Sequence, residues 1–143
     1  MIALNKLKIS LSILLGLLLI SFGYTQQLIN WTQANTNGFG DIYNTSINSI
    51  AEYNNYLYCG TNNSGGYGAK LYRSSDGTSW TQFGVNAFGD YTNNGIYSLA
   101  VFNGYLYAGT YNYNYGAELW RIDGTTWTQI GPNGFSYRYN YAI

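Results

Sequence analysis

One feature restricts the fold of this chain more than any other, namely an internal repeat of nearly 50 residues. The tripeptide Trp-Thr-Gln begins at Trp31, Trp80 and Trp127, which lie 49 and then 47 residues apart. Further motifs recur in one order between these tryptophans: Phe-Gly-Asp, Tyr-Leu-Tyr-x-Gly-Thr, Gly-Ala-x-Leu-x-Arg and Asp-Gly-Thr-x-Trp. So many matches in one register define repeat units at about residues 31–79, 80–126 and, in part, 127–143.

Each complete unit has the pattern of four short strands. In the first unit we predict strands over residues 47–53, 56–61 and 69–74 and a fourth strand that begins at Trp80. In the second unit we predict strands over residues 96–102, 105–110 and 117–122 and a fourth strand that begins at Trp127. Asn54-Asn55 and Asn103-Gly104 separate the first two strands of each unit. Asn and Gly tolerate the positive φ angles that a type I′ turn requires, so each pair of strands is expected to form a hairpin.

These strands predict an all-β fold made of β-propeller blades, each a four-stranded antiparallel sheet, with a repeat of about 48 residues. The run Leu99-Ala100-Val101-Phe102 is apolar at every position, which predicts a strand covered on both faces. Blades stack face to face around an axis and would cover it in this way. A two-sheet sandwich is the second choice, because it leaves one face of each sheet in water.

The repeat also suggests that about two blades of an incomplete propeller are present. Ile143 aligns with Ile47 and Ile96, the first residues of the predicted first strands. Closed propellers usually have about four to eight blades. The sequence is therefore interpreted as part of a longer protein, and self-assembly of several copies into a ring is the alternative.

Residues 1–25 have the pattern of a secretory signal peptide. Lys6 and Lys8 precede an apolar run over residues 9–20, and small residues follow near Gly23 and Thr25. An uncleaved anchor helix is the alternative, although the run is shorter than the ~20 residues that a spanning helix needs. Cleavage would leave residues 26–143 as a secreted or cell-surface repeat region that does not lie in a membrane.

Charge and composition exclude several classes of function. Loss of residues 1–25 would leave four basic and six acidic residues, a formal charge of −2, which argues against nucleic-acid binding. The chain has no His, so it cannot supply a Ser-His-Asp triad, and its acidic residues lack metal-ligand spacing. We therefore expect no catalytic site, metal or cofactor within these residues. Cys59 is the sole cysteine and is expected to be a small buried residue of a strand.

The repeated motifs resemble those of secreted bacterial β-propeller proteins with kelch-like blades. The segment Ser-Ser-Asp-Gly-Thr-Ser-Trp over residues 74–80 also resembles a degenerate Asp-box, the hairpin motif of sialidase-like propellers, with one residue fewer between Asp and Gly. The resemblance covers about residues 31–143. It implies the blade and not an activity, because the Asp-box is a turn element distant from sialidase catalysis.

The predicted turns contain Asp76-Gly77 and Asp123-Gly124. An Asp side chain can accept hydrogen bonds from the backbone two residues on, and Gly supplies the conformation that the turn needs. These four residues are therefore interpreted as structural turn residues. Calcium binding is the alternative for the two aspartates, although no neighbouring acid completes an oxygen cage.

Tyrosine and asparagine alternate in the loop between the second and third strands of the second unit. Flat aromatic faces and amide groups on a scaffold loop suit sugars or protein surfaces. The candidate ligand-binding residues are Tyr111, Asn112, Tyr113 and Tyr115, together with Tyr67 of the equivalent loop. The alternative is that these rings only cover the edge of the blade.

The sequence therefore favours an extracellular binding module that presents Tyr- and Asn-rich loops to glycan or protein ligands. One alternative is the N-terminal part of an exported, sialidase-like, glycan-processing enzyme whose active groups lie outside this chain. The other is a purely structural repeat of a surface adhesin.

Overall fold

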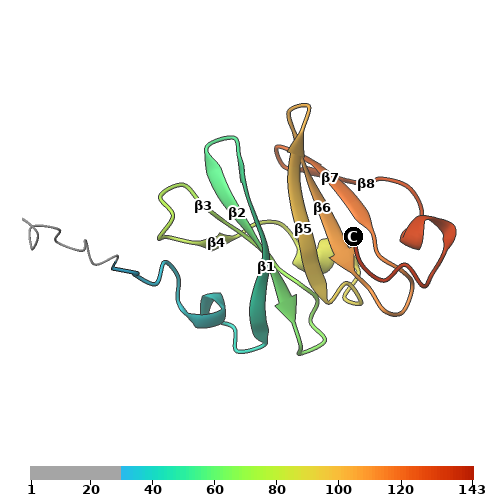
Figure 1. The fold of residues 1–143 in the computed structure, drawn as a ribbon, viewed down its shortest axis with the longest axis horizontal. Coiled ribbons are helices and arrows are strands. Elements are labelled where there is room, and N and C mark those ends of the chain that lie inside the picture. The colour runs from blue at the N-terminus through green and yellow to red at the C-terminus, as the bar shows by residue number, and fades with distance from the viewer. Residues whose placement is uncertain (1–29) are drawn as a thin grey trace, which may run out of the picture. The chain divides into compact units, whose positions relative to one another are not determined.

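A computed structural model describes residues 30–143 of the chain. The predicted leader over residues 1–25 lies outside this range. The chain divides into a unit of residues 1–32 and a compact unit of residues 33–143. The regular structure of the second unit is antiparallel β-strand with three short 3-10 turns, and residues 30–143 contain no α-helix (Figure 1). The expected all-β class is confirmed.

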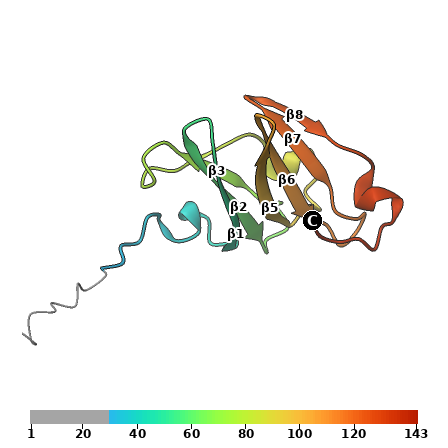
Figure 2. The same ribbon diagram turned by 45° about the horizontal axis from the view of Figure 1, so that its top comes forward.

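Eight strands form one hydrogen-bonded antiparallel sheet that consists of two consecutive four-stranded meanders, which lie side by side in both views (Figures 1 and 2) and are here named the first and the second sheet. The first sheet contains β1 (Asn44–Tyr53), β2 (Tyr56–Asn63), β3 (Leu71–Ser74) and β4 (Thr81–Gln82). The second sheet contains β5 (Gly95–Phe102), β6 (Tyr105–Tyr111), β7 (Leu119–Asp123) and β8 (Thr126–Gln129). A single residue pair, Asn62 with Gly95, joins β2 to β5.

The two sheets have the same strand register. Ile47 pairs with Thr61 in the first sheet as Ile96 pairs with Thr110 in the second, and a register shift follows each isoleucine. The predicted two-residue turns are present, with φ of 49° and 60° at Asn54-Asn55 and of 49° and 78° at Asn103-Gly104. Similar sequences therefore produce similar local structure, as their shared turn chemistry requires.

A short 3-10 turn precedes each sheet and recurs a third time near residue 135. These turns are η1 (Asn37–Gly40), η2 (Asn86–Gly89) and η3 (Asn133–Ser136), and the second and third residues of each have positive φ. An asparagine amide donates to the carbonyl of the second residue in every copy, from Asn44 to Gly38, Asn93 to Ala87 and Asn140 to Gly134. These hydrogen bonds offset the strain of the left-handed residues.

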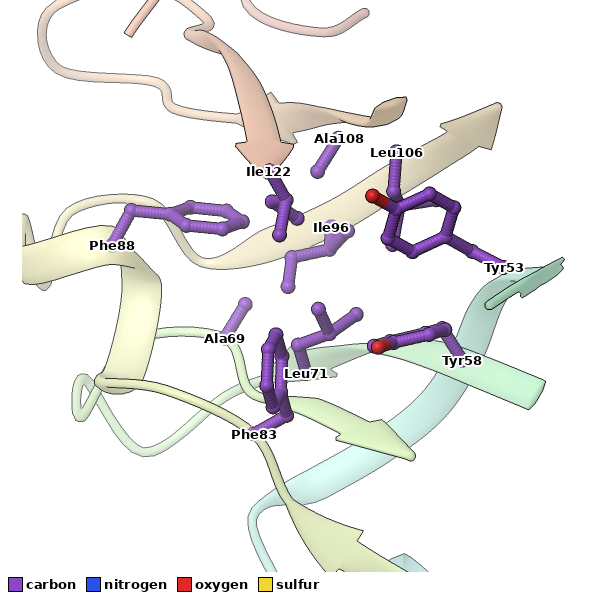
Figure 3. Packing of buried hydrophobic residues seen from close by; sticks show 10 residues of the cluster. All are labelled: Tyr53, Tyr58, Ala69, Leu71, Phe83, Phe88, Ile96, Leu106, Ala108 and Ile122. Carbon is purple, nitrogen blue, oxygen red and sulfur yellow. The ribbon is translucent and has the colours of Figure 1, made fainter. Parts of the chain in front are cut away.

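The hydrophobic core lies between the two sheets. Side chains from the first sheet and its following loop meet side chains from the second sheet in Figure 3, and the cluster comprises Tyr53, Tyr58, Ala69, Leu71, Phe83, Phe88, Ile96, Leu106, Ala108 and Ile122. The closest approach requires glycine, since a Cβ on Gly60 would lie 2.6 Å from Ile96 Cγ2. Each sheet thus buries one face against the other.

Two expectations from the strand pattern are wrong in detail. Val101 and Phe102 are exposed rather than covered on both faces, because only one of the two faces of β5 meets another sheet. The third strands β3 and β7 also begin two residues later than expected, at Leu71 and Leu119, because Ala69 and Ala117 bond to the segments that follow their sheets. Cys59 is buried in β2 as expected, and this burial raises the pKa of its thiol to about 11.

Candidate functional site

The loops that connect the second and third strands carry the predicted binding residues. Tyr67 lies in the first of these loops, and Tyr113 and Tyr115 lie in the second; all three side chains are exposed. The ring of Tyr67 packs against Tyr43, with ring centroids 5.5 Å apart. Tyr111, at the end of β6, is half-buried and stacks on Tyr97 at 5.1 Å. The aromatic rings therefore form pairs on the surface of the loop region.

Asn112 is a structural residue of this loop and not part of its exposed surface. Its side chain is fully buried, and its amide nitrogen donates to Thr92 Oγ1 at 2.9 Å and to Asn93 Oδ1 at 3.0 Å. Its side-chain oxygen accepts from the backbone N–H groups of Asn114 and Tyr115. With these partners Asn112 fixes the course of the loop, and its side chain does not lie on the exposed loop surface.

Five residues of the second loop and the C-terminal segment form an open cavity of about 210 Å³, here named the tyrosine cup. It is lined by Tyr113, Asn114, Arg138, Tyr139 and Tyr141. The loop and the segment are held together by a backbone hydrogen bond from Asn112 N–H to the Tyr141 carbonyl, at 2.8 Å. Backbone pairing, and not ring contact alone, therefore positions the cup.

The rings and the single cation of the cup contact one another. Tyr113 stacks on Tyr141 with centroids 4.8 Å apart, and Tyr139 meets the edge of Tyr141 at 6.1 Å. The Arg138 guanidinium lies 4.9 Å from the Tyr139 ring centroid, and its Nη2 donates to the Tyr139 hydroxyl at 3.1 Å. Desolvation by these neighbours raises the pKa of the Tyr141 hydroxyl, and nearby Tyr113 and Tyr139 act in the same direction. The Tyr141 phenol therefore stays a neutral donor and acceptor at physiological pH.

Tyr113 was identifiable from the sequence, whereas Asn114, Arg138, Tyr139 and Tyr141 were missed. The signal that could have found two of them is departure from the repeat. Arg138 aligns with Ile42 and Tyr91, and Tyr141 aligns with Thr45 and Asn94. The scaffold that the repeats share does not require one particular residue type at such a position, so the side chain there can contact a ligand.

Asp76, Gly77 and Gly124 lie in the predicted turns, and Asp123 is the last residue of β7, directly before its turn. Asp76 Oδ1 accepts hydrogen bonds from the backbone N–H groups of Thr78 and Ser79 at 2.8 and 2.7 Å, and these bonds lower the pKa of Asp76. Asp123 pairs with Thr126 across the β7–β8 turn. Gly77 and Gly124 have φ of 76° and 56°, so both adopt the left-handed conformation.

Several other charged side chains of the described residues have structural partners. Lys70 Nζ lies 2.7 Å from Asp41 Oδ2, and buried Glu118 accepts hydrogen bonds from Asn93, Trp120 and Asn133. Arg73 and Arg121 lie over the rings of Tyr56 and Tyr105 at 4.6 and 4.7 Å, the cation–π geometry of equivalent repeat positions.

Within residues 30–143, no three His, Cys, Asp or Glu side chains are grouped so that they could hold a metal ion. The same range has no helix of the length and hydrophobicity needed to cross a membrane. No protein-family model, curated protein or solved structure matches this chain. The geometry of the cup is therefore the main guide to function.

Proposed function

We propose that this chain is an exported binding module that takes a carbohydrate residue in the tyrosine cup. The observation that carries the proposal is the convergence of three tyrosine rings, one amide and one guanidinium on a single open cavity. The apolar faces of sugar rings pack on aromatic rings, while their hydroxyls bond to amide, phenol and guanidinium groups. The cup offers both kinds of contact in one place.

The size of the cup favours a sugar over a protein ligand. Sites for drug-sized molecules begin at roughly 300 Å³, and specific protein interfaces bury roughly 800 Å² on each partner. A cavity of about 210 Å³ suits one sugar residue, such as a terminal unit of a glycan. Its open side leaves room for the rest of the glycan to extend into solvent.

The two sheets support the proposal that the scaffold is a β-propeller. Each is a four-stranded antiparallel meander, and the sheets share a register and pack face to face through a common core. These are the properties of neighbouring blades. We propose in addition that residues 1–25 direct export and that the cup acts outside the cell, where glycans are abundant.

Glycan-array binding of the purified chain, with neutral and acidic oligosaccharides as probes, tests the carbohydrate proposal. Tyr113→Ser and Tyr141→Asn introduce the residues found at the equivalent positions Ser64 and Asn94, so the scaffold is expected to tolerate both. Tyr67→Ser is the matched control, because it removes an exposed tyrosine that lies outside the cup. We expect at least about tenfold weaker binding for the two cup variants and unchanged binding for the control.

Two results would contradict this proposal. Binding that survives both cup substitutions would place the ligand elsewhere, and binding that falls equally in Tyr67→Ser would indicate general stickiness of exposed tyrosine. A chain that binds no glycan but retains a protein from the cell surface would favour the protein-ligand alternative.

A further inference from the structure

The core between the two sheets shows how one repeat unit covers the next. Tyr53 and Leu71 of the first sheet contact Ile96 and Leu106 of the second in a single buried cluster (Figure 3). Ser49 Oγ adds a hydrogen bond of 3.0 Å to the Ile96 carbonyl. The interface is asymmetric, because one face of the first sheet meets the opposite face of the second.

The outer face of each sheet is the face that points away from this core. At equivalent repeat positions, this face carries residues similar to those that the other sheet contributes to the core. Phe102 on the second sheet occupies the position of Tyr53, yet 71% of its surface is exposed against 6% for Tyr53. Ile47 on the first sheet occupies the position of Ile96, and its exposure is 48% against 1%. The molecule therefore exposes Ile47 on one half and Phe102 on the other half of an interface that it has already formed once internally, while Ile143 lies against Gly109 on the second half, as Ile96 lies against Gly60 in the core.

A cleft of about 310 Å³ at the first sheet corresponds to a space that the chain's own backbone fills at the second sheet. Its lining includes Gly38, Asn44 and Ile47, next to η1. Gly38 and Asn44 are equivalent to Ala87 and Asn93 at the second sheet. There Ala87 N–H donates to the Ala69 carbonyl at 2.7 Å, and Ala69 N–H donates to the Asn93 carbonyl at 2.8 Å. The space that Gly68-Ala69 fills at the second sheet is thus an open cleft at the first.

We propose that a second copy of this chain docks head to tail. The outer face of the second sheet in one copy covers the outer face of the first sheet in the next, and the backbone at Gly116-Ala117 enters the cleft beside η1. These two residues are equivalent to Gly68-Ala69, so the contact repeats the internal interface with the same residue types. An interface between two different faces is heterologous, and its repetition leads to rings or filaments.

Docking requires one segment to move. Within each copy Ala117 already forms two backbone hydrogen bonds with the C-terminal segment. Gly134 N–H donates to the Ala117 carbonyl, and Ala117 N–H donates to the Asn140 carbonyl, both at 2.7 Å. These partners are equivalent to Gly38 and Asn44 of the incoming copy. Residues 131–143 therefore give way to the equivalent residues 35–47 of the neighbour, as in an exchange of matching segments. This movement takes Arg138, Tyr139 and Tyr141 out of the tyrosine cup, so a copy whose second sheet is docked does not bind a sugar there, and only the copy with a free second sheet retains the cup.

Sedimentation velocity over a range of protein concentrations tests this proposal. We expect reversible association of the unaltered chain. Phe102→Asp disables only the second-sheet face and Ile47→Asp only the first-sheet face, so each variant alone should associate at least about tenfold more weakly. Both positions are substantially exposed in the single chain, and circular dichroism checks that each variant folds.

The decisive measurement is a mixture of the two variants. Each retains the face that the other has lost, so a head-to-tail interface predicts that an equimolar mixture forms a one-to-one dimer that grows no further. Asn140→Ala, which removes the hydrogen bond from Asn140 to Gly134 and loosens the competing segment, should strengthen association of the unaltered faces. A chain that is monomeric at every concentration, or variants that fail to complement each other, would overturn the proposal.

Discussion

Ile47 and Ile96 form a matched pair that tests the packing of the two sheets. Each occupies the last paired position before the register shift that the two sheets share, opposite Thr61 and Thr110. Their strand environment and their contribution to the unfolded chain are therefore alike, but Ile96 is 1% exposed and Ile47 is 48% exposed. Replacing each by alanine isolates the contribution of the interface between the sheets.

The expected loss of stability follows from the carbon atoms removed. Ile→Ala deletes three carbons, worth ~2.4 kcal/mol of transfer free energy when fully buried, at ~0.8 kcal/mol each. At Ile96 a cavity left between two sheets raises the total to about 3–4 kcal/mol. At Ile47 only about half of the transfer term applies and no closed cavity forms, so the loss is about 1 kcal/mol. The two variants should thus differ by about 2–3 kcal/mol.

Urea unfolding followed by tryptophan fluorescence measures this difference. The protein concentration must stay low, where copies of the chain are not associated, because docking would also bury Ile47. Equal destabilisation by Ile47→Ala and Ile96→Ala would refute the reasoning, since it would mean that Ile96 is not enclosed by a neighbouring sheet.

Three further predictions concern single positions. Gly60→Ala should destabilise the fold by about 1–3 kcal/mol in urea unfolding, because the added Cβ would lie 2.5 Å from Ser49 Oγ and 2.6 Å from Ile96 Cγ2. Asp41→Asn should make the free energy of unfolding fall less steeply below about pH 4. The hydrogen bond from Lys70 lowers the folded pKa of Asp41. The Asp41 carboxylate therefore contributes stability above the unfolded pKa of ~3.9, and this stability is lost as the pH falls through the lower folded pKa. Cys59 should resist iodoacetamide at pH 8 until urea unfolds the chain, since its thiol is buried and has a pKa of about 11.

Controls for these three are available in the same chain. Gly77→Ala adds a Cβ with no atom within 4 Å, at a residue whose φ is 76°. It therefore shows the effect of backbone strain alone, whereas Gly60→Ala tests the steric effect of the added Cβ. A pH profile for Asp41→Asn that matches the unaltered chain would contradict the role of the Lys70 hydrogen bond. Rapid alkylation of Cys59 in the native state would show that β2 opens frequently.

The repeat made the strands predictable because the sequence contains two copies of each strand. The features that both copies share, despite their different side chains, identify the strand. The register shift after Ile47 and Ile96 was not predictable, since it depends on which residues face each other across the sheet. The left-handed residues of the 3-10 turns were also missed. Phe39, Phe88 and Phe135 have φ of 55°, 57° and 51°, a conformation that bulky residues rarely adopt. A hydrogen bond from an asparagine six residues after the second residue of each turn holds this conformation, and the conformational preference of a single residue does not contain that information.

The candidate site was only half predictable for a related reason. The alternation of Tyr and Asn over residues 111–115 is visible in the sequence, and it led to Tyr113. Arg138, Tyr139 and Tyr141 reach the same cavity through the backbone pairing of residue 141 with residue 112, a contact between separate segments. The burial of Asn112 was not predictable either, because the residue type does not show that its amide is enclosed by Thr92 and Asn93.

Departure from the repeat is therefore informative only in combination with exposure. Lys70 and Glu118 occupy one repeat position and have opposite charge, and each backbone N–H bonds to an equivalent threonine hydroxyl, of Thr61 or Thr110. The carboxylate of Glu118 is buried and accepts three hydrogen bonds, so this departure is absorbed by the scaffold. Arg138 also departs from its equivalents, but it is exposed beside a cavity, and its hydrogen-bonding partner is a neighbouring phenol. A guanidinium forms up to five hydrogen bonds, so Arg138 retains donors for a ligand where Glu118 retains few acceptors.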